Sequence, residues 1–259
     1  PRMHPRHMAS VDLKGDTFPV IKVRGSASRM ETLALLDTSV AESWVEFSTA
    51  GEFNTVFLGL DERTIPYRGI QYIGQAEAYA AVIPQLRIKQ FFIEDSPVYV
   101  RMAVNSLGPL SRGIQEPRKI GAVLGFDLLR NCEYIRFDMI KGTVDFSATT
   151  PYEPNSELLI GTAQIVPVQG VGLAVEGTVD GAPTPVLMDF AGNFSLSLNN
   201  ATINRTQMIS LGEVVYVNTP TVVGRTPDGL PRAGLRMLRQ YVVTVCPRIG
   251  VVYFERPLP

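Results

Sequence analysis

Short alternating runs of apolar and polar residues fill most of this chain of 259 residues. Such runs predict β-strands when they are rich in β-branched and aromatic residues and are bounded by Gly, Pro, Asn or Asp. We expect strands at residues 18–23, 32–36, 93–100, 134–137, 214–217 and 241–245. Helical periodicity is confined to residues 125–130 and 234–239. The pattern therefore predicts an all-β protein with one or two helical turns.

The two helical segments indicate an internal repeat, because both read Gly-x-x-x-Leu-Arg. Each is followed by a strand, a glycine and a second strand, which ends at Phe146 in the first half and at Phe254 in the second. Upstream, the Leu-Leu-Asp-Thr-Ser of residues 35–39 has a counterpart in the Leu-Met-Asp-Phe-Ala of residues 187–191. A duplicated unit of this kind predicts two lobes related by an approximate two-fold axis.

The boundary between the lobes is expected near Pro151 and Pro154, which interrupt the strand pattern. The N-terminal lobe would cover residues 11–150 and the shorter C-terminal lobe residues 151–259, after a start (1–10) that resembles a tag remnant. The first lobe has about 43 more residues than the second between its aspartate and its helical turn. We assign much of this excess to a hairpin within residues 67–79 and to a loop at residues 105–119.

Composition limits the classes of function. Hydrophobic residues make up 45% of the chain, enough for a sizeable core. The net charge is −1 and no like charges cluster, which argues against binding to nucleic acid or to an anionic membrane surface. No apolar run approaches the roughly 20 residues of a transmembrane helix, so we expect no membrane span.

Histidine is the most informative residue type, because His4 and His7 are the only two and both lie in the tag-like start. Ser-His-Asp and Cys-His catalysis and zinc hydrolysis all need imidazole and are therefore excluded from the body of the chain. Cys132 and Cys246 are too few for a disulfide scaffold. We interpret them as buried apolar side chains and leave a bridge between them open. No metal or cofactor is expected.

Asp37 and Asp189 are the candidate reactive groups. Each follows an apolar strand end, and a two-fold axis would bring them to a shared site. Two neighbouring carboxylates cannot both ionise easily, so the pair would hold one proton between them. The ionised member could take a proton from water while the protonated member donates to a carbonyl oxygen. The pair therefore predicts amide hydrolysis by an activated water.

Residues 35–45, Leu-Leu-Asp-Thr-Ser-Val-Ala-Glu-Ser-Trp-Val, resemble the catalytic strand and loop of the retropepsin-like aspartic proteases. Residues 120–130, which contain Ala-Val-Leu-Gly, are similar to the apolar-apolar-Gly element behind that loop. Residues 186–198 and 232–239 resemble the same unit less closely. The resemblance covers nearly the whole body of the chain.

The resemblance implies a bilobal, pepsin-like fold of two retropepsin-like barrels with a central cleft and with Asp37 and Asp189 as catalytic residues. It implies a monomer, because one chain supplies both halves of the site, and a peptide or protein substrate bound in an extended form. The flap that closes over substrate would lie within residues 67–79, with Gly69 and Gly74 at its bends. Its aromatic residue would be Tyr72 or Tyr79, and the alternative role of these tyrosines is packing against a neighbouring strand. Activity would need no cofactor.

The residues that support the catalytic loops depart from the family pattern in one lobe. Thr38 matches the pattern, in which the hydroxyl of the residue directly after each aspartate braces the two loops, and Ser39 is a familiar variant of the glycine that usually follows it. Phe190 cannot make such a bond, so we expect the brace to be at most half built. Ala191 replaces the usual glycine and is tolerable by its size.

Val40 and Gly192 stand where pepsin-type enzymes carry a hydroxyl bonded to a carboxylate oxygen. Without these hydroxyls we expect raised carboxyl pKa values and activity in mildly acidic conditions. The alternative is a pseudoprotease, a peptide-binding or regulatory module in which Phe190 spoils the catalytic geometry. The sequence does not fix the compartment, and an extracytoplasmic location is favoured.

Overall fold

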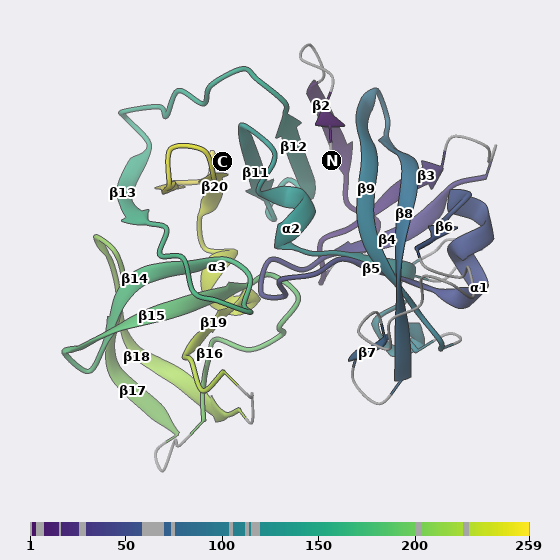
Figure 1. Ribbon diagram of the computed structural model, residues 1–259. Helices are drawn as coiled ribbons and strands as arrows, with labels where there is room; N and C mark the ends of the chain where they lie inside the picture. Colours follow the sequence, from purple (N-terminus) through teal and green to yellow (C-terminus); the bar gives the residue numbers. More distant parts are fainter. Residues whose placement is uncertain are drawn as a thin grey trace.

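The computed structural model describes residues 2–3, 8–15, 17–25, 30–58, 70–73, 76–103, 106–111, 114, 120–199, 204–224 and 228–258. Its regular elements are almost all strands, arranged as two barrels side by side with a sheet across both (Figure 1). The prediction of an all-β chain is confirmed. Each of the six predicted strands has a counterpart in the structure, and the two helical turns correspond to α2 (Phe126–Leu129) and α3 (Leu235–Leu238).

Six strands of the first half close into a barrel, drawn purple to teal in Figure 1. They are β3 (Val20–Gly25), β4 (Thr32–Leu36), β5 (Trp44–Glu46), β8 (Ala76–Ile88), β9 (Phe91–Arg101) and β10 (Ile120–Leu124). Strand β4 lies between β3 and β10, and all five of its residues are buried. Burial on both faces explains why this segment is a continuous apolar run rather than an alternating one.

The second half closes a barrel of the same design, drawn green to yellow. Its strands are β14 (Ala174–Val179), β15 (Ala182–Asp189), β16 (Leu196–Leu198), β17 (Arg205–Leu211), β18 (Val214–Val223) and β19 (Arg232–Gly234). Every pairing repeats the first barrel: β15 and β19 are parallel, as β4 and β10 are, and β16 joins β19 antiparallel, as β5 joins β10. Two closed barrels are compatible with the predicted two lobes.

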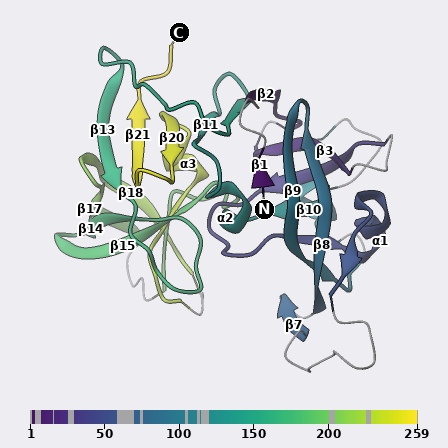
Figure 2. The same cartoon turned by 45° about the horizontal axis from the view of Figure 1, so that its top comes forward.

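A six-stranded sheet joins the barrels and comes forward in Figure 2. Its order is β13 (Leu159–Gln164), β21 (Val251–Glu255), β20 (Val242–Cys246), β11 (Tyr134–Asp138), β12 (Thr143–Ser147) and β2 (Met8–Asp12). Each half of the chain supplies three strands, and β11 pairs antiparallel with β20 at the centre. The approximate two-fold axis therefore passes between these two strands.

The first lobe carries additional short elements. These are β1 (Arg2–Met3), α1 (Phe47–Ala50), 3₁₀ turns at Gly51–Phe53 and Gly108–Ser111, β6 (Val56–Phe57) and β7 (Ile70–Ile73). Strand β7 pairs with the start of β8, which gives the hairpin predicted within residues 67–79. Part of the tag-like start also belongs to the fold, because residues 8–10 lie in β2 and Ala9 is buried.

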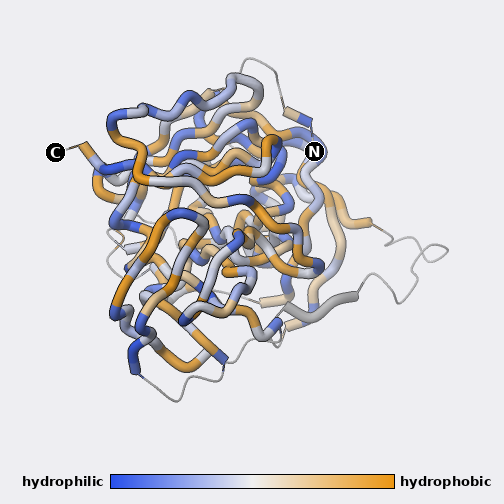
Figure 3. Tube along the Cα trace, turned by 90° about the vertical axis from the view of Figure 1, so that its left-hand side faces the viewer, coloured by the Kyte–Doolittle hydropathy of each residue, from blue (hydrophilic) through white to orange (hydrophobic). Residues whose placement is uncertain are grey.

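One apolar core runs through both barrels and the joining sheet. Figure 3 shows hydrophobic stretches along the strands and hydrophilic ones at many of the turns. A smaller cluster on the other face of β4 contains Leu33, Leu35, Trp44 and Val123, and Ala191 of the second lobe packs against it. Among the described residues no helix is long and apolar enough to cross a membrane.

Gly125 and Gly234 allow β10 and β19 to pass close behind the loops that follow β4 and β15. A Cβ atom on Gly125 would lie 2.7 Å from the carbonyl oxygen of Glu42, and one on Gly234 would lie 2.4 Å from that of Phe194. Both obstacles are backbone atoms, which cannot rotate away. The glycines of the repeated motif are therefore required by close approach.

We expect Gly125→Ala to lower the free energy of unfolding by roughly 1–3 kcal/mol, because the added methyl group displaces the loop at Glu42. Gly51→Ala is the matched control, since its Cβ would meet nothing within 4 Å and its φ of −64° suits alanine. Urea unfolding of both variants measures the difference. Equal stability of the two variants would contradict the steric argument.

Candidate active site

Asp37 and Asp189 occupy equivalent places in the two barrels, Asp37 directly after β4 and Asp189 at the end of β15. The neighbouring strand of each barrel holds the loop that follows. The Asp37 amide donates to Leu124 O of β10 at 3.0 Å, and the Gly234 amide of β19 donates to Ser195 O at 2.7 Å. Both loops are thereby fixed to rigid strands.

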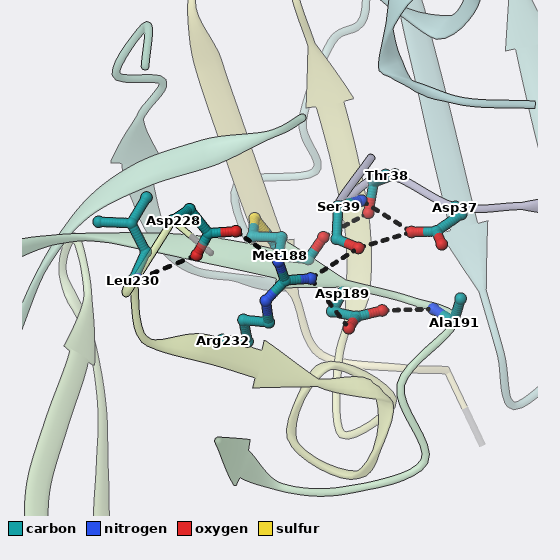
Figure 4. A network of polar contacts seen from close by, with 9 residues as sticks. All are labelled: Asp37, Thr38, Ser39, Met188, Asp189, Ala191, Asp228, Leu230 and Arg232. Atoms are coloured by element: carbon teal, nitrogen blue, oxygen red, sulfur yellow. Dashed lines mark hydrogen bonds and ion pairs between the residues drawn. The ribbon is translucent and has the colours of Figure 1, made fainter. Parts of the chain in front are cut away.

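The loop at Asp37 is bound to the second lobe through Thr38. Its Oγ1 donates to the carbonyl oxygen of Met188 at 2.5 Å, and both residues are buried. The Thr38 carbonyl accepts from the Leu173 amide at 2.6 Å. The bond from Thr38 to Met188 connects the residues beside the two aspartates across the junction between the lobes (Figure 4).

Phe190, the counterpart of Thr38, has no hydroxyl and forms a different contact. Its ring is fully buried and stacks on Phe137 of β11, with 4.1 Å between centroids and 17° between planes. Because Phe137 belongs to the first half of the chain, this stack also crosses between the lobes. The expected half-built brace is therefore a hydroxyl on one side and an aromatic pair on the other.

The two carboxylates have unequal hydrogen-bond partners. Asp37 Oδ1 accepts from the Ser39 amide at 2.9 Å and from Ser39 Oγ at 2.8 Å. Asp189 Oδ1 accepts from the Ala191 amide at 3.0 Å. The sequence predicted no hydroxyl bonded to either carboxylate, because Val40 and Gly192 stand where pepsin-type enzymes carry one. The Ser39 hydroxyl supplies such a bond to Asp37.

Burial raises the pKa of both carboxyl groups above the ordinary value of 3.8. For Asp189, loss of water and then the charge of Asp37 raise the pKa to about 7. For Asp37, loss of water raises the pKa, while the bonds from Ser39 oppose the rise. The hydrogen bonds favour a negative charge on Asp37 and a proton on Asp189.

Arg232 is a part of this site that we did not anticipate. Its Nη1 lies 3.9 Å from Asp189 Oδ2 and donates to Ser39 Oγ at 3.3 Å, while Nη2 donates to Asp228 Oδ2 at 2.6 Å. Figure 4 shows the guanidinium between Asp228 on one side and the two loops on the other. An arginine two residues before the glycine of the second motif was the available sequence signal.

The remaining expectations have different outcomes. Gly69 and Gly74 lie outside the described residues, and Tyr72 lies in β7, paired with Glu77. Cys132 and Cys246 are both buried and unbridged. Within the part of the chain that the structure describes, no three His, Cys, Asp or Glu side chains gather in a metal-binding arrangement.

No protein-family model matches the chain, and no curated protein matches it.

Thr38→Val should lower the free energy of unfolding by roughly 1–3 kcal/mol, since it leaves the buried Met188 carbonyl without its hydroxyl donor. Thr38→Ser keeps the hydroxyl and should lose clearly less. Urea unfolding at one pH compares the two variants. If valine were tolerated as well as serine, the bond to Met188 would not contribute to stability.

Asp189→Asn should stabilise the protein at pH 8 and leave it unchanged near pH 4. The folded pKa of about 7 exceeds the unfolded value of 3.8, so the wild type loses stability as the pH rises from 3.8 to about 7, and the loss is complete above that pH. Asparagine keeps the acceptor for the Ala191 amide and carries no charge. We expect a gain on the order of 1–3 kcal/mol at pH 8, measured by urea unfolding across this range. A gain that does not depend on pH would show that charge burial is not its cause.

Proposed function

We propose that this protein is an aspartic endopeptidase in which Asp37 and Asp189 activate one water molecule. The observation that carries the proposal is the pairing of two carboxyl groups, Asp189 buried and Asp37 partly buried, on equivalent loops of two barrels, with pKa values raised by loss of water. Such a pair can hold a single proton near neutral pH. It can therefore supply a base and an acid together, without histidine.

In the proposed first step, ionised Asp37 takes a proton from water, and the resulting hydroxide oxygen bonds to the peptide carbonyl carbon. Protonated Asp189 gives its proton to the carbonyl oxygen, which yields an uncharged tetrahedral diol. Asp37 now holds a proton and Asp189 is ionised. The Ser39 bonds to Asp37 support its starting charge.

In the second step, Asp37 gives its proton to the amide nitrogen while Asp189 takes one from a hydroxyl of the diol. The C–N bond breaks, the carbonyl re-forms, and a carboxylic acid and an amine leave. Asp37 is again ionised and Asp189 protonated. The pair returns to its starting state without any external proton donor.

The substrate in this proposal is a peptide in an extended conformation. Backbone hydrogen bonding of a strand type would orient the scissile bond over the pair, and the β7–β8 hairpin is the proposed flap. The attack requires the carbonyl carbon and the water to be held close together, which extended binding between two rigid loops favours.

Cleavage of a mixed peptide library from pH 3 to 8, followed by mass spectrometry, tests the proposal. We expect cleavage to be maximal in mildly acidic solution and to fall as the pH rises through about 7, because Asp189 then loses its proton. Asp37→Asn and Asp189→Asn should each reduce the rate at least 100-fold, within the range for loss of acid or base catalysis. Asp12→Asn, at an exposed position of β2, is the control and should leave the rate unchanged.

Cuts that persist in both active-site variants would contradict the two-aspartate mechanism. A protein that binds library peptides but cuts none of them at any pH would instead support the pseudoprotease alternative.

A further inference from the structure

Arg232 occupies a position for which the fold requires no charge. In the pairing of β15 with β19, Arg232 lies opposite Leu187, and in the equivalent pairing of β4 with β10, Val123 lies opposite Leu35. Val123 is 3% exposed and belongs to an apolar cluster. A valine therefore satisfies the strand geometry at this position, and the arginine needs another explanation.

The contacts of Arg232 all lead toward the aspartate pair or anchor the guanidinium. Through Nη1 it reaches Asp189 of its own lobe at 3.9 Å, and at 3.3 Å it reaches the Ser39 hydroxyl, which in turn donates to Asp37. The side chain is only 17% exposed, and among the described residues nothing accepts a hydrogen bond from its buried Nε. One cation therefore contacts the loops of both lobes.

Asp228 holds this cation in place. Its Oδ2 accepts from Nη2 at 2.6 Å, and its Oδ1 accepts from the Leu230 amide at 2.9 Å. The amide bond fixes the carboxylate, and the carboxylate fixes the guanidinium. Asp228 also offsets part of the positive charge that the aspartate pair would otherwise experience.

We propose that Arg232, anchored by Asp228, is a positioning residue that sets the charge carried by the Asp37–Asp189 pair. The charged groups that face the guanidinium among the described residues are Asp189 from β15, Asp37 through Ser39 after β4, and Asp228 before β19. A cation near a carboxylate favours its ionised form. Burial disfavours a negative charge on the pair, and Arg232 counteracts this effect, so that the pair can hold one negative charge.

The two partners should act in opposite directions. Arg232→Met removes the cation, so the pair should bind its protons more tightly and titrate at higher pH. Asp228→Asn keeps the acceptor for the Leu230 amide but removes the opposing charge, so the cation acts more strongly and the pair should titrate at lower pH. Arg232→Lys keeps the charge and should resemble the wild type.

The test is a titration of the full chain labelled with ¹³Cγ-aspartate, followed by NMR from pH 3 to 9. Asp37→Asn and Asp189→Asn assign the two signals. We expect Arg232→Met to raise the titration midpoint of the pair by about one pH unit, a tenfold change in proton affinity, and Asp228→Asn to lower it. Arg236→Met, which removes an exposed arginine of α3, is the control and should shift nothing.

An unchanged midpoint in Arg232→Met, or shifts of the same sign in Arg232→Met and Asp228→Asn, would overturn this proposal. If Arg232→Met fails to fold, Asp228→Asn and Arg232→Lys still test it, because an upward shift in the first or a large shift in the second contradicts it. The catalytic consequence rests on the proposed protease function, but the titration needs no activity. Opposite shifts without peptide cleavage would uphold the role of Arg232 and reject the protease.

Discussion

Removal of water from two neighbouring carboxyl groups is the constraint to which the other features of the site respond. Burial opposes a charge on Asp37 and on Asp189, and a charge on one opposes a charge on the other. The loops that carry the two carboxyl groups are held from behind by backbone bonds to β10, to β19 and to the residue that follows β19. The stability of the two barrels must therefore offset the free-energy cost of removing these carboxyl groups from water.

The symmetry of the fold makes its exceptions informative. The lobes differ at three pairs of equivalent positions. Thr38 of the first lobe corresponds to Phe190 of the second, and Ser39 corresponds to Ala191. The apolar Val123 corresponds to Arg232. All three differences lie beside the aspartates. They give two carboxyl groups of the same type unequal surroundings, and unequal surroundings allow one carboxyl group to keep a proton that the other loses.

Much of the architecture could be predicted from the sequence, because the evidence is local and occurs twice. The strands, the helical turns and the repeated Gly-x-x-x-Leu-Arg segments each depend on residues close together in the chain. What escaped prediction depends on residues far apart. The stack of Phe190 on Phe137 and the bond of Arg232 to Ser39 join opposite lobes, and no local pattern specifies such partners. Ser39 was expected to support its loop by its small size, whereas its hydroxyl also bonds Asp37 directly.

The central pair of the joining sheet has a consequence for how the molecule is made. Strands β11 and β20 are about 110 residues apart in sequence, so the N-terminal barrel and β11 can be synthesised long before β20, the partner strand of β11, exists. Until then β11 presents a row of unpaired backbone groups, a surface that another nascent chain could pair with. Contacts of such long range also form slowly. Assembly on the ribosome would thus pass through a half-built stage, vulnerable to association with its own copies, that ends only when the last two strands arrive.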